Sequence, residues 1–298
     1  MRNLMLANFA RLRRSRLFWV MEACVFAWGV LAYFMWKVNI RNGYLFENGN
    51  AYFFNEMTFI GITTACFSGF FIGTEYSDGT IRNKLMAGHS RVVVYLANLV
   101  VVFFAGIAQF AAYTLAALTA GPLFVGDLVW SSLYRLVETL ALSFLSICMS
   151  AAIAVLISMV IIDKSKAILV NTLFSVLLLA AGASALKGLM QPEMTKRAYI
   201  ADTGEYKYAF EDNFPDNEDL VIEEVPNPKY LTGMERRVYV CISAVLPTAQ
   251  ALSCAIGESD VDENAYERFS GLHIFGTFLA VMFLSGSGIK IFMKRDIK

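Results

Sequence analysis

Few side chains in this sequence have the type and spacing to do chemistry, and most of them lie in one polar interruption. It runs from residue 73 to 98 between two apolar runs. The register from Ile81 to Met86 permits a helix. A short helix of mixed charge, tied at both ends to apolar runs, is placed to pass motion from a soluble partner into a membrane, and a solvated loop is the alternative interpretation. The charged residues of the interruption are Glu75, Asp78, Arg82, Lys84 and Arg91.

Catalytic chemistry finds little support. The two histidines, His89 and His273, are far apart in the sequence, and neither H-E-x-x-H nor G-x-S-x-G occurs. The run 286–290, GSGIK, is too short to be a phosphate-binding loop. We therefore expect no enzyme activity, no ATP hydrolysis by this chain, and no metal or cofactor bound to it. His89 is expected at a helix end or a partner contact, and His273 at a membrane interface.

The elements that must position these residues are membrane helices. The chain has 298 residues, is 57% hydrophobic and has a mean hydropathy of +0.53. Repeated apolar runs of about 20 residues match a hydrocarbon core about 30 Å thick. A barrel would show shorter alternating segments. We predict an all-α membrane protein with six spans, at 17–37, 53–73, 93–120, 129–162, 167–186 and 271–292.

The basic residues predict the orientation. Segments 1–16, 74–91, 163–166 and 290–298 hold fourteen Lys and Arg, whereas the loops 37–52 and 121–128 hold only Lys37 and Arg41. The positive-inside rule therefore places both termini in the cytoplasm, which requires an even number of spans. Residues 1–16 carry five arginines and no acid, and they are predicted to form an interfacial helix on the cytoplasmic surface.

Residues 191–268 form the one sizeable part expected outside the membrane. They hold 16 acids and 7 bases, which indicates a solvated cap or, alternatively, a field that concentrates cationic substrates or divalent ions. Segments 204–210 and 220–225 are predicted to pair as strands. Within this part, 238–256 is predicted to be a re-entrant or interfacial hairpin, because it is short and its middle is broken by Pro247, Thr248 and Gln250. The predicted regions are thus 1–16, 17–190, 191–268 and 269–298.

Small residues recur every four positions in two spans. Such stripes let helices approach closely, either within one subunit or against a second, sliding subunit. Hydroxyls and amides in the second and fifth spans are candidates for the path of an amphiphilic substrate, although such groups often bond their own backbone. The stripes are Gly61, Ala65, Gly69, Gly73 and Ser146, Ser150, Ala154, Ser158; the path candidates are Thr64, Ser68, Asn171, Thr172 and Ser175.

Ionisable groups inside spans are costly and therefore functional candidates by default. Glu22 lies about one turn into the first span and is expected to pair with an arginine such as Arg16. Arg135 and Glu138 share a helix face and are expected to neutralise each other. Glu56 begins the second span at the predicted outer interface. These groups show no recognisable proton relay. Cys24, Cys66 and Cys148 are expected to pack as small hydrophobes, and a disulfide between Cys241 and Cys254 is left open.

The polar interruption resembles a motif of the permease subunits of ABC-2-type exporters. Residues 75–85, EYSDGTIRNKL, and 88–91, GHSR, match a string that follows the second span in that family. Segments 227–231, NPKYL, and 246–251, LPTAQA, resemble the stretch before the last span. The resemblance implies that 74–91 is a cytoplasmic coupling helix that docks on an ATPase subunit. The residues expected to transfer force are Glu75, Tyr76, Asp78, Gly79, Thr80, Arg82, Lys84 and Arg91.

The resemblance also implies the assembly. Two permeases, identical or related, would join two ATPase subunits in a bacterial cell membrane, with ATP and Mg on the ATPase and with lipids, but no nucleic acid, as further partners. ATP binding would open a path between the permeases for an amphiphilic compound such as an antimicrobial peptide, lipid or drug. A membrane sensor with an acidic ligand-binding cap and an ion-coupled secondary transporter remain alternatives.

Overall fold

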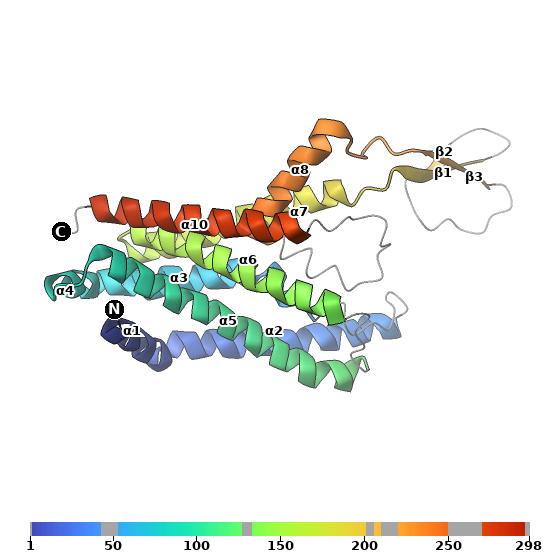
Figure 1. The fold of residues 1–298 in the computed structure, drawn as a ribbon. Coiled ribbons are helices and arrows are strands. Elements are labelled where there is room, and N and C mark those ends of the chain that lie inside the picture. The colour runs from blue at the N-terminus through green and yellow to red at the C-terminus, as the bar shows by residue number, and fades with distance from the viewer. Residues whose placement is uncertain are drawn as a thin grey trace.

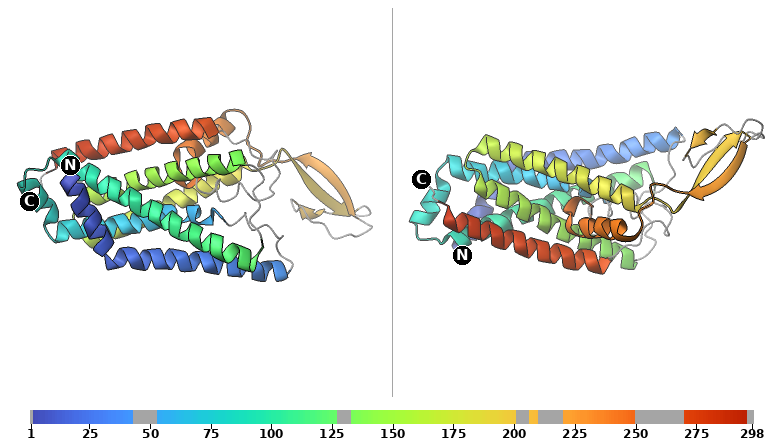
Figure 2. Two further views of the ribbon diagram at one scale, coloured as in Figure 1. Left: turned by 60° about the horizontal axis from the view of Figure 1, so that its bottom comes forward. Right: turned by 90° about the horizontal axis from the view of Figure 1, so that it is seen from above.

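The computed structural model describes residues 2–42, 53–126, 133–200, 206–209, 220–249 and 270–295. These residues form a bundle of long helices with a small antiparallel sheet beyond one end (Figure 1). The short helix α4 (Thr80–Met86) and both ends of the chain lie at the opposite end (Figures 1 and 2). We refer to these as the α4 end and the sheet end. Chain ends on one side agree with the predicted even number of crossings.

Five helices among the described residues are long and apolar enough to cross a membrane. They correspond to the first, third, fourth, fifth and sixth predicted spans, which are therefore confirmed as helices of sufficient length. Side-chain oxygens of Ser15, Ser90 and Asp163 cap three of them by accepting a backbone N–H. The five helices are α2 (Arg16–Arg41), α5 (Arg91–Phe124), α6 (Leu133–Val160), α7 (Lys164–Leu189) and α10 (Ser270–Lys294).

The second predicted span differs from its prediction. Residues 53–73 were expected to be helical throughout, but helix α3 covers Ile60–Ser77 and is preceded by a 3₁₀ turn, η2, over Asn55–Thr58. α3 is not among the five apolar helices, because threonines, serines, glycines and Glu75 lower its hydropathy. It is instead enclosed by α5, α6 and α7, with its most extensive contacts on α7. A sixth membrane crossing stays a prediction.

The buried apolar side chains form two clusters along the bundle. The first lies toward the α4 end and joins Phe18, Phe67 and Val101 with residues of α1 (Arg2–Arg14) and α6. The second lies toward the sheet end and includes Val25, Ile60 and Tyr113. Helix α1 packs on the first cluster through Leu4 and Leu12, so the predicted N-terminal helix forms. Its place at a membrane interface stays a prediction.

A three-stranded antiparallel sheet stands beyond the helices (Figure 1), with β1 (Met194–Ile200) between β2 (Tyr206–Ala209) and β3 (Leu220–Pro226). The prediction that segments 204–210 and 220–225 pair with each other was wrong, because each pairs with β1 instead. The register of β1 and β3 sets Lys196 opposite Glu224 and Arg197 opposite Glu223. The sequence analysis predicted no strand at β1, although opposite charges at paired positions favour antiparallel strands.

The predicted hairpin is described over its first limb and its tip. Helix α8 (Gly233–Val245) runs back toward the bundle, and the helix is interrupted at Leu246 before residues 247–249 become helical again. The second limb, with Gln250 and Cys254, lies outside the described residues. Cys241 is exposed and free. The break at Leu246 and Pro247 agrees with the prediction, while a position in the outer leaflet stays a prediction.

Candidate coupling site

Glu75, near the end of α3, is the centre of a buried polar cluster at the α4 end. Its carboxylate is fully buried and forms ion pairs with Arg11 of α1 and Lys84 of α4. Arg11 also donates to the Phe71 carbonyl oxygen at 3.1 Å, and its guanidinium lies 3.7 Å from the centre of the Phe71 ring. One carboxylate therefore ties together three helices that are separate in the sequence.

Two asparagines extend the cluster to α5. Asn98 donates to the second Glu75 oxygen at 2.9 Å, and Asn8 donates to the Asn98 side-chain oxygen at 3.1 Å. Lys84 in turn donates to the Asn8 side-chain oxygen at 2.8 Å. The groups form a closed ring of hydrogen bonds across α1, α3, α4 and α5. We call Asn8, Arg11, Glu75, Lys84 and Asn98 the Glu75 hub.

The electrostatics of the hub favour a single arrangement. Burial lowers the pKa of the Arg11 guanidinium and of the Lys84 ammonium, and the nearby Glu75 carboxylate opposes both shifts. Without that carboxylate, two cations would face each other in a poorly solvated site. Removing one partner of a buried ion pair typically costs about 3–5 kcal/mol. Glu75 is therefore required to hold α1 and α4 against α3.

Two glycines bound α4. Gly79 precedes α4 with φ 66° and Gly88 follows it with φ 85°, a left-handed conformation that glycine adopts without the Cβ penalty of other residues. The N–H of Gly88 donates to the Leu85 carbonyl at 3.0 Å and that of His89 to the Lys84 carbonyl at 3.2 Å, which is a Schellman ending. The G-T and G-H-S-R parts of the motif thus encode the turns that bound α4, and His89 lies at its helix end.

A second set of contacts ties the ends of the long helices together at the α4 end. The Tyr76 hydroxyl donates to the Met159 carbonyl at the end of α6 at 2.8 Å, and Arg295 donates to the same oxygen at 2.8 Å. Arg91, at the start of α5, donates to the Phe292 and Met293 carbonyls at the end of α10, at 3.1 and 3.2 Å. These cations satisfy carbonyls that a helix end leaves unpaired. Motion of α3 would therefore reach α6 directly.

The structure divides the eight predicted coupling residues into two groups. Glu75 is fully buried and Lys84 nearly so, so both lie behind the outer surface of this chain, and their part in force transfer stays a prediction. Tyr76 and Arg91 bind other helices of this chain, and Gly79 and Thr80 shape the turn before α4. The residues left facing outward are Asp78 and Arg82, joined by Met86, which is 68% exposed.

Sequence reasoning missed Asn8, Arg11 and Asn98 as members of the hub. Asn98 stands in a long apolar helix, where a lone amide normally needs a buried partner. Asn8 lies midway between Leu4 and Leu12 on the face of α1 that packs on the bundle. Both positions carried a signal that a polar contact was required, but the partner could not be identified without the fold.

The two small-residue stripes lie inside this chain. A Cβ on Gly69 would lie 2.8 Å from the Ile168 Cα, and one on Gly73 would lie 2.9 Å from the Lys164 Cα. Ala65 and Ala154 are buried as well. The stripes are covered by helices of the same subunit, which confirms the interpretation of close packing within one subunit, whereas contact with a second subunit stays a prediction. They serve the close packing of α3 on α7 and of α6 on its neighbours.

Residues of the predicted substrate path join helices instead of lining an open passage. Asn171 donates to the Ser158 hydroxyl at 2.6 Å, and the Ser158 and Ser68 hydroxyls lie 3.0 Å apart. Thr64 and Ser175 are also buried, and Thr172 is partly buried. In this conformation Ser68, Ser158 and Asn171 act as polar links between α3, α6 and α7, whereas the Thr64 and Thr172 hydroxyls have no hydrogen bond to a described residue. Their role in a path that opens stays a prediction.

The tip of the predicted hairpin reaches deep between the helices. Ser146 of α6 donates to the Pro247 carbonyl at 2.8 Å, and the Thr248 hydroxyl donates to the Leu178 carbonyl of α7 at 2.5 Å. A Cβ on Gly182 would meet Thr248 at 2.5 Å, so Gly182 makes room for the tip. The break in the hairpin thus exposes a carbonyl that a helix of the bundle binds.

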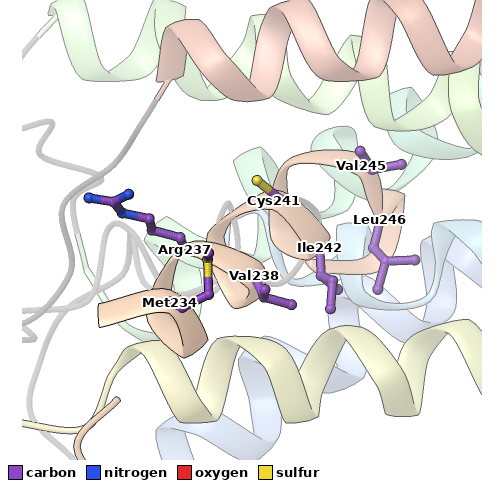
Figure 3. Close-up of a pocket in the computed structure, with 7 residues that line it drawn as sticks. All are labelled: Met234, Arg237, Val238, Cys241, Ile242, Val245 and Leu246. Atoms are coloured by element: carbon purple, nitrogen blue, oxygen red, sulfur yellow. The ribbon is translucent and has the colours of Figure 1, made fainter. Parts of the chain in front are cut away.

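The outward side of α8 carries an apolar groove of about 450 Å³ (Figure 3). Arg237 lies at one end of the groove, with its guanidinium pointing away from the helix axis. The remaining lining is apolar and suits contact with lipid tails. The groove is lined by Met234, Arg237, Val238, Cys241, Ile242, Val245 and Leu246.

Comparison with known families decides the class of this protein. A family model described as ABC-2 family transporter protein matches residues 4–188, which is more than half of the chain. The chain belongs to the ABC-2 transporter family. Together with the apolar helices, membership of this family shows that the chain is a multi-pass membrane protein. It also indicates a permease component of a transporter, a kind of subunit that is generally not itself catalytic. No curated protein and no solved structure matches the chain.

The matched region contains the complete coupling site. Residues 4–188 include α1 from Leu4 onward, α4 and every member of the Glu75 hub, so the first motif lies within the family match. The second motif, at 227–231 and 246–251, lies beyond it. In the structure Asn227 holds a turn, since its amide donates to the Pro192 carbonyl at 3.0 Å and its side-chain oxygen accepts the Lys229 N–H at 2.9 Å.

Proposed function

We propose that this chain is the membrane subunit of an ATP-driven exporter and that α4 docks on a separate ATPase subunit. The observation that carries the proposal is the Glu75 hub, which fixes a short exposed helix rigidly to three other helices. A push on Asp78, Arg82 and Met86 would be transmitted through Lys84 and Glu75 into α3, and through Asn98 into α5. Membership of the ABC-2 family supports the association with an ATP-binding subunit.

In the proposed complex both chain ends and α4 face the cytoplasm of a bacterial cell, and two permeases, identical or related, form the path. The basic residues at the α4 end support this orientation. The substrate is an amphiphilic compound such as an antimicrobial peptide, a lipid or a drug. Since both small-residue stripes are buried within the chain, the second permease would pack against the exposed apolar faces of outer helices such as α2 and α10, which carry Trp19, Leu31, Phe278 and Met282.

The test is co-purification in mild detergent from the native host. A subunit bearing a phosphate-binding loop should accompany the tagged chain, and Met86→Asp combined with Arg82→Glu should remove it, because both residues are exposed on α4 and outside the hub. Arg237→Glu, an exposed change of the same kind on α8, is the matched control and should leave the complex intact. A chain that purifies alone, or a complex insensitive to the α4 changes, would contradict the proposal.

A further inference from the structure

A layer of polar side chains separates the two apolar clusters of the bundle. On α2, Glu22 lies between Phe18 of the first cluster and Val25 of the second. Thr64 of α3 lies in the same way between Phe67 and Ile60, and Gln109 of α5 between Ala105 and Tyr113. Three helices therefore change from apolar to polar at the same depth. Because this depth lies inside helices long enough to span a membrane, the polar groups require an explanation.

Contacts between elements place these groups together. A Cβ on Gly106, one turn from Gln109 on α5, would lie 3.3 Å from the Thr64 hydroxyl and 2.8 Å from Ile147 of α6. Glu56, in the 3₁₀ turn before α3, lies beside Met57, which belongs to the same apolar cluster as Val25 of α2, three residues from Glu22. Glu56 is only 1% exposed and therefore lies inside the protein, while its predicted level at the outer membrane interface stays a prediction. We call Glu22, Glu56, Thr64 and Gln109 the polar layer.

The polar layer holds several groups that lack partners. Within the described part of the chain, one carboxylate oxygen each of Glu22 and Glu56, both ends of the Gln109 amide and the Thr64 hydroxyl are buried without a hydrogen bond. The expected pairing of Glu22 with an arginine is absent among these residues. A buried polar group without a hydrogen bond destabilises the protein, and more so when it is charged. Two carboxylates and two neutral oxygens form a set of acceptors that suits a positive charge.

We propose that the polar layer binds the cationic group of an amphiphilic substrate, such as a protonated amine or an organic cation. The proposal rests on the proposed exporter function and narrows its substrates to cationic amphiphiles. Glu56 and Glu22 supply the opposite charge, and the Gln109 and Thr64 oxygens add neutral acceptors at the same level between the two clusters. Glu22 is partly exposed at the edge of the bundle while one of its oxygens is buried, so it joins the lipid-facing surface to the interior.

The experiment measures binding of radiolabelled tetraphenylphosphonium to the purified full-length chain in lipid nanodiscs, with empty nanodiscs subtracted. This probe is a permanent hydrophobic cation, and tetraphenylborate provides an anion of the same shape. The wild-type chain should bind the cation and reject the anion. Glu56→Gln and Glu22→Gln should each weaken cation binding at least tenfold, because they keep the size of the side chain and remove its charge.

Glu138→Gln is the matched control, since Glu138 is a partly buried carboxyl of α6 outside the polar layer. Equal thermal stability of the variants shows that they are folded. The proposal is overturned if the wild-type chain binds no cation, if it binds the anion equally well, or if both polar-layer variants bind like the wild type. The assay needs no ATPase, so its failure is distinguishable from a failure of the co-purification test.

Discussion

Replacing Glu75 by glutamine tests whether the hub depends on one buried charge. The substitution keeps the shape of the side chain but leaves Arg11 and Lys84 without a counter-ion. Lys84 has a side chain only 10% exposed and carries most of the cost, whereas Arg11 is 32% exposed and is partly screened by solvent. Breaking a buried pair in this way costs about 3–5 kcal/mol, and we expect a loss of about 3 kcal/mol in the free energy of unfolding.

The matched variant is Lys84→Met, which removes a cation instead of the anion. Glu75 then keeps Arg11 and Asn98 as partners, and the lost hydrogen bonds are those of Lys84 to Glu75 and to Asn8, so we expect a loss of about 2 kcal/mol, at about 1 kcal/mol for each bond. The double variant with Glu75→Gln and Lys84→Met should lose less stability than the sum of the two single losses, because neither charge is then left without the other. The difference, the interaction energy of the pair, should be about 1–3 kcal/mol. The free energy of unfolding is measured by titration of mixed micelles with a denaturing detergent, at one protein concentration for all variants.

The same variants give a pH test with a defined sign. Burial already lowers the pKa of Lys84, and Glu75 opposes that shift, so Glu75→Gln should lower the pKa further. A folded-state pKa below the unfolded value means that the unfolded chain binds more protons, and stability then rises with pH between the two values. The deficit of Glu75→Gln should therefore shrink between pH 7 and pH 9.5. A deficit no larger than that of Lys84→Met, or one that grows with pH, would refute the reasoning.

Two further predictions concern packing and the helix-end contacts. Gly69→Ala should lower the free energy of unfolding by about 1–3 kcal/mol, since its Cβ would lie 2.8 Å from the Ile168 Cα. The control Gly286→Ala on α10, with no atom within 4 Å of its Cβ, should be neutral or slightly stabilising. Equal effects of the two changes in denaturation curves would contradict the close contact of α3 and α7. Tyr76→Phe should lower the free energy of unfolding by about 1 kcal/mol, because it removes the hydrogen bond to the Met159 carbonyl. The control Tyr134→Phe, at an exposed position of α6, should leave the free energy of unfolding unchanged in the same assay. A Tyr76→Phe protein as stable as the wild type would show that this bond does not hold α6.

The positions of the long helices were predictable because the lengths of the apolar runs in the sequence determine them. The helices at 91–124 and 164–189 each extend a few residues beyond the predicted spans 93–120 and 167–186, where Ser90 and Asp163 supply the caps. The prediction failed for residues 53–59, since a run of apolar residues does not reveal whether it begins a helix or a 3₁₀ turn. It also failed for β1, whose basic residues are matched by acids that lie far along the chain.

The candidate site was predictable in its location but not in the roles of its residues. The motif from Glu75 to Arg91 correctly marked a short helix bounded by glycine turns, because glycine at a left-handed position is a local property. Whether a charge faces outward or inward is not local. Glu75 turned inward because Arg11 and Lys84 converge on it, and Arg82 stayed outside.

The composition of α3 has a consequence for how the chain is made. The helix ends at Ser77 and is synthesised well before its main packing partner, which begins at Lys164. Until α7 emerges, Gly69 and Gly73 face no neighbour, and the polar groups of α3 would be presented to lipid or to the insertion machinery. A helix enclosed by α5, α6 and α7 is thus one that is not apolar enough to count among the five candidate spans, and its final position is completed late in biosynthesis, when the later helices close around it.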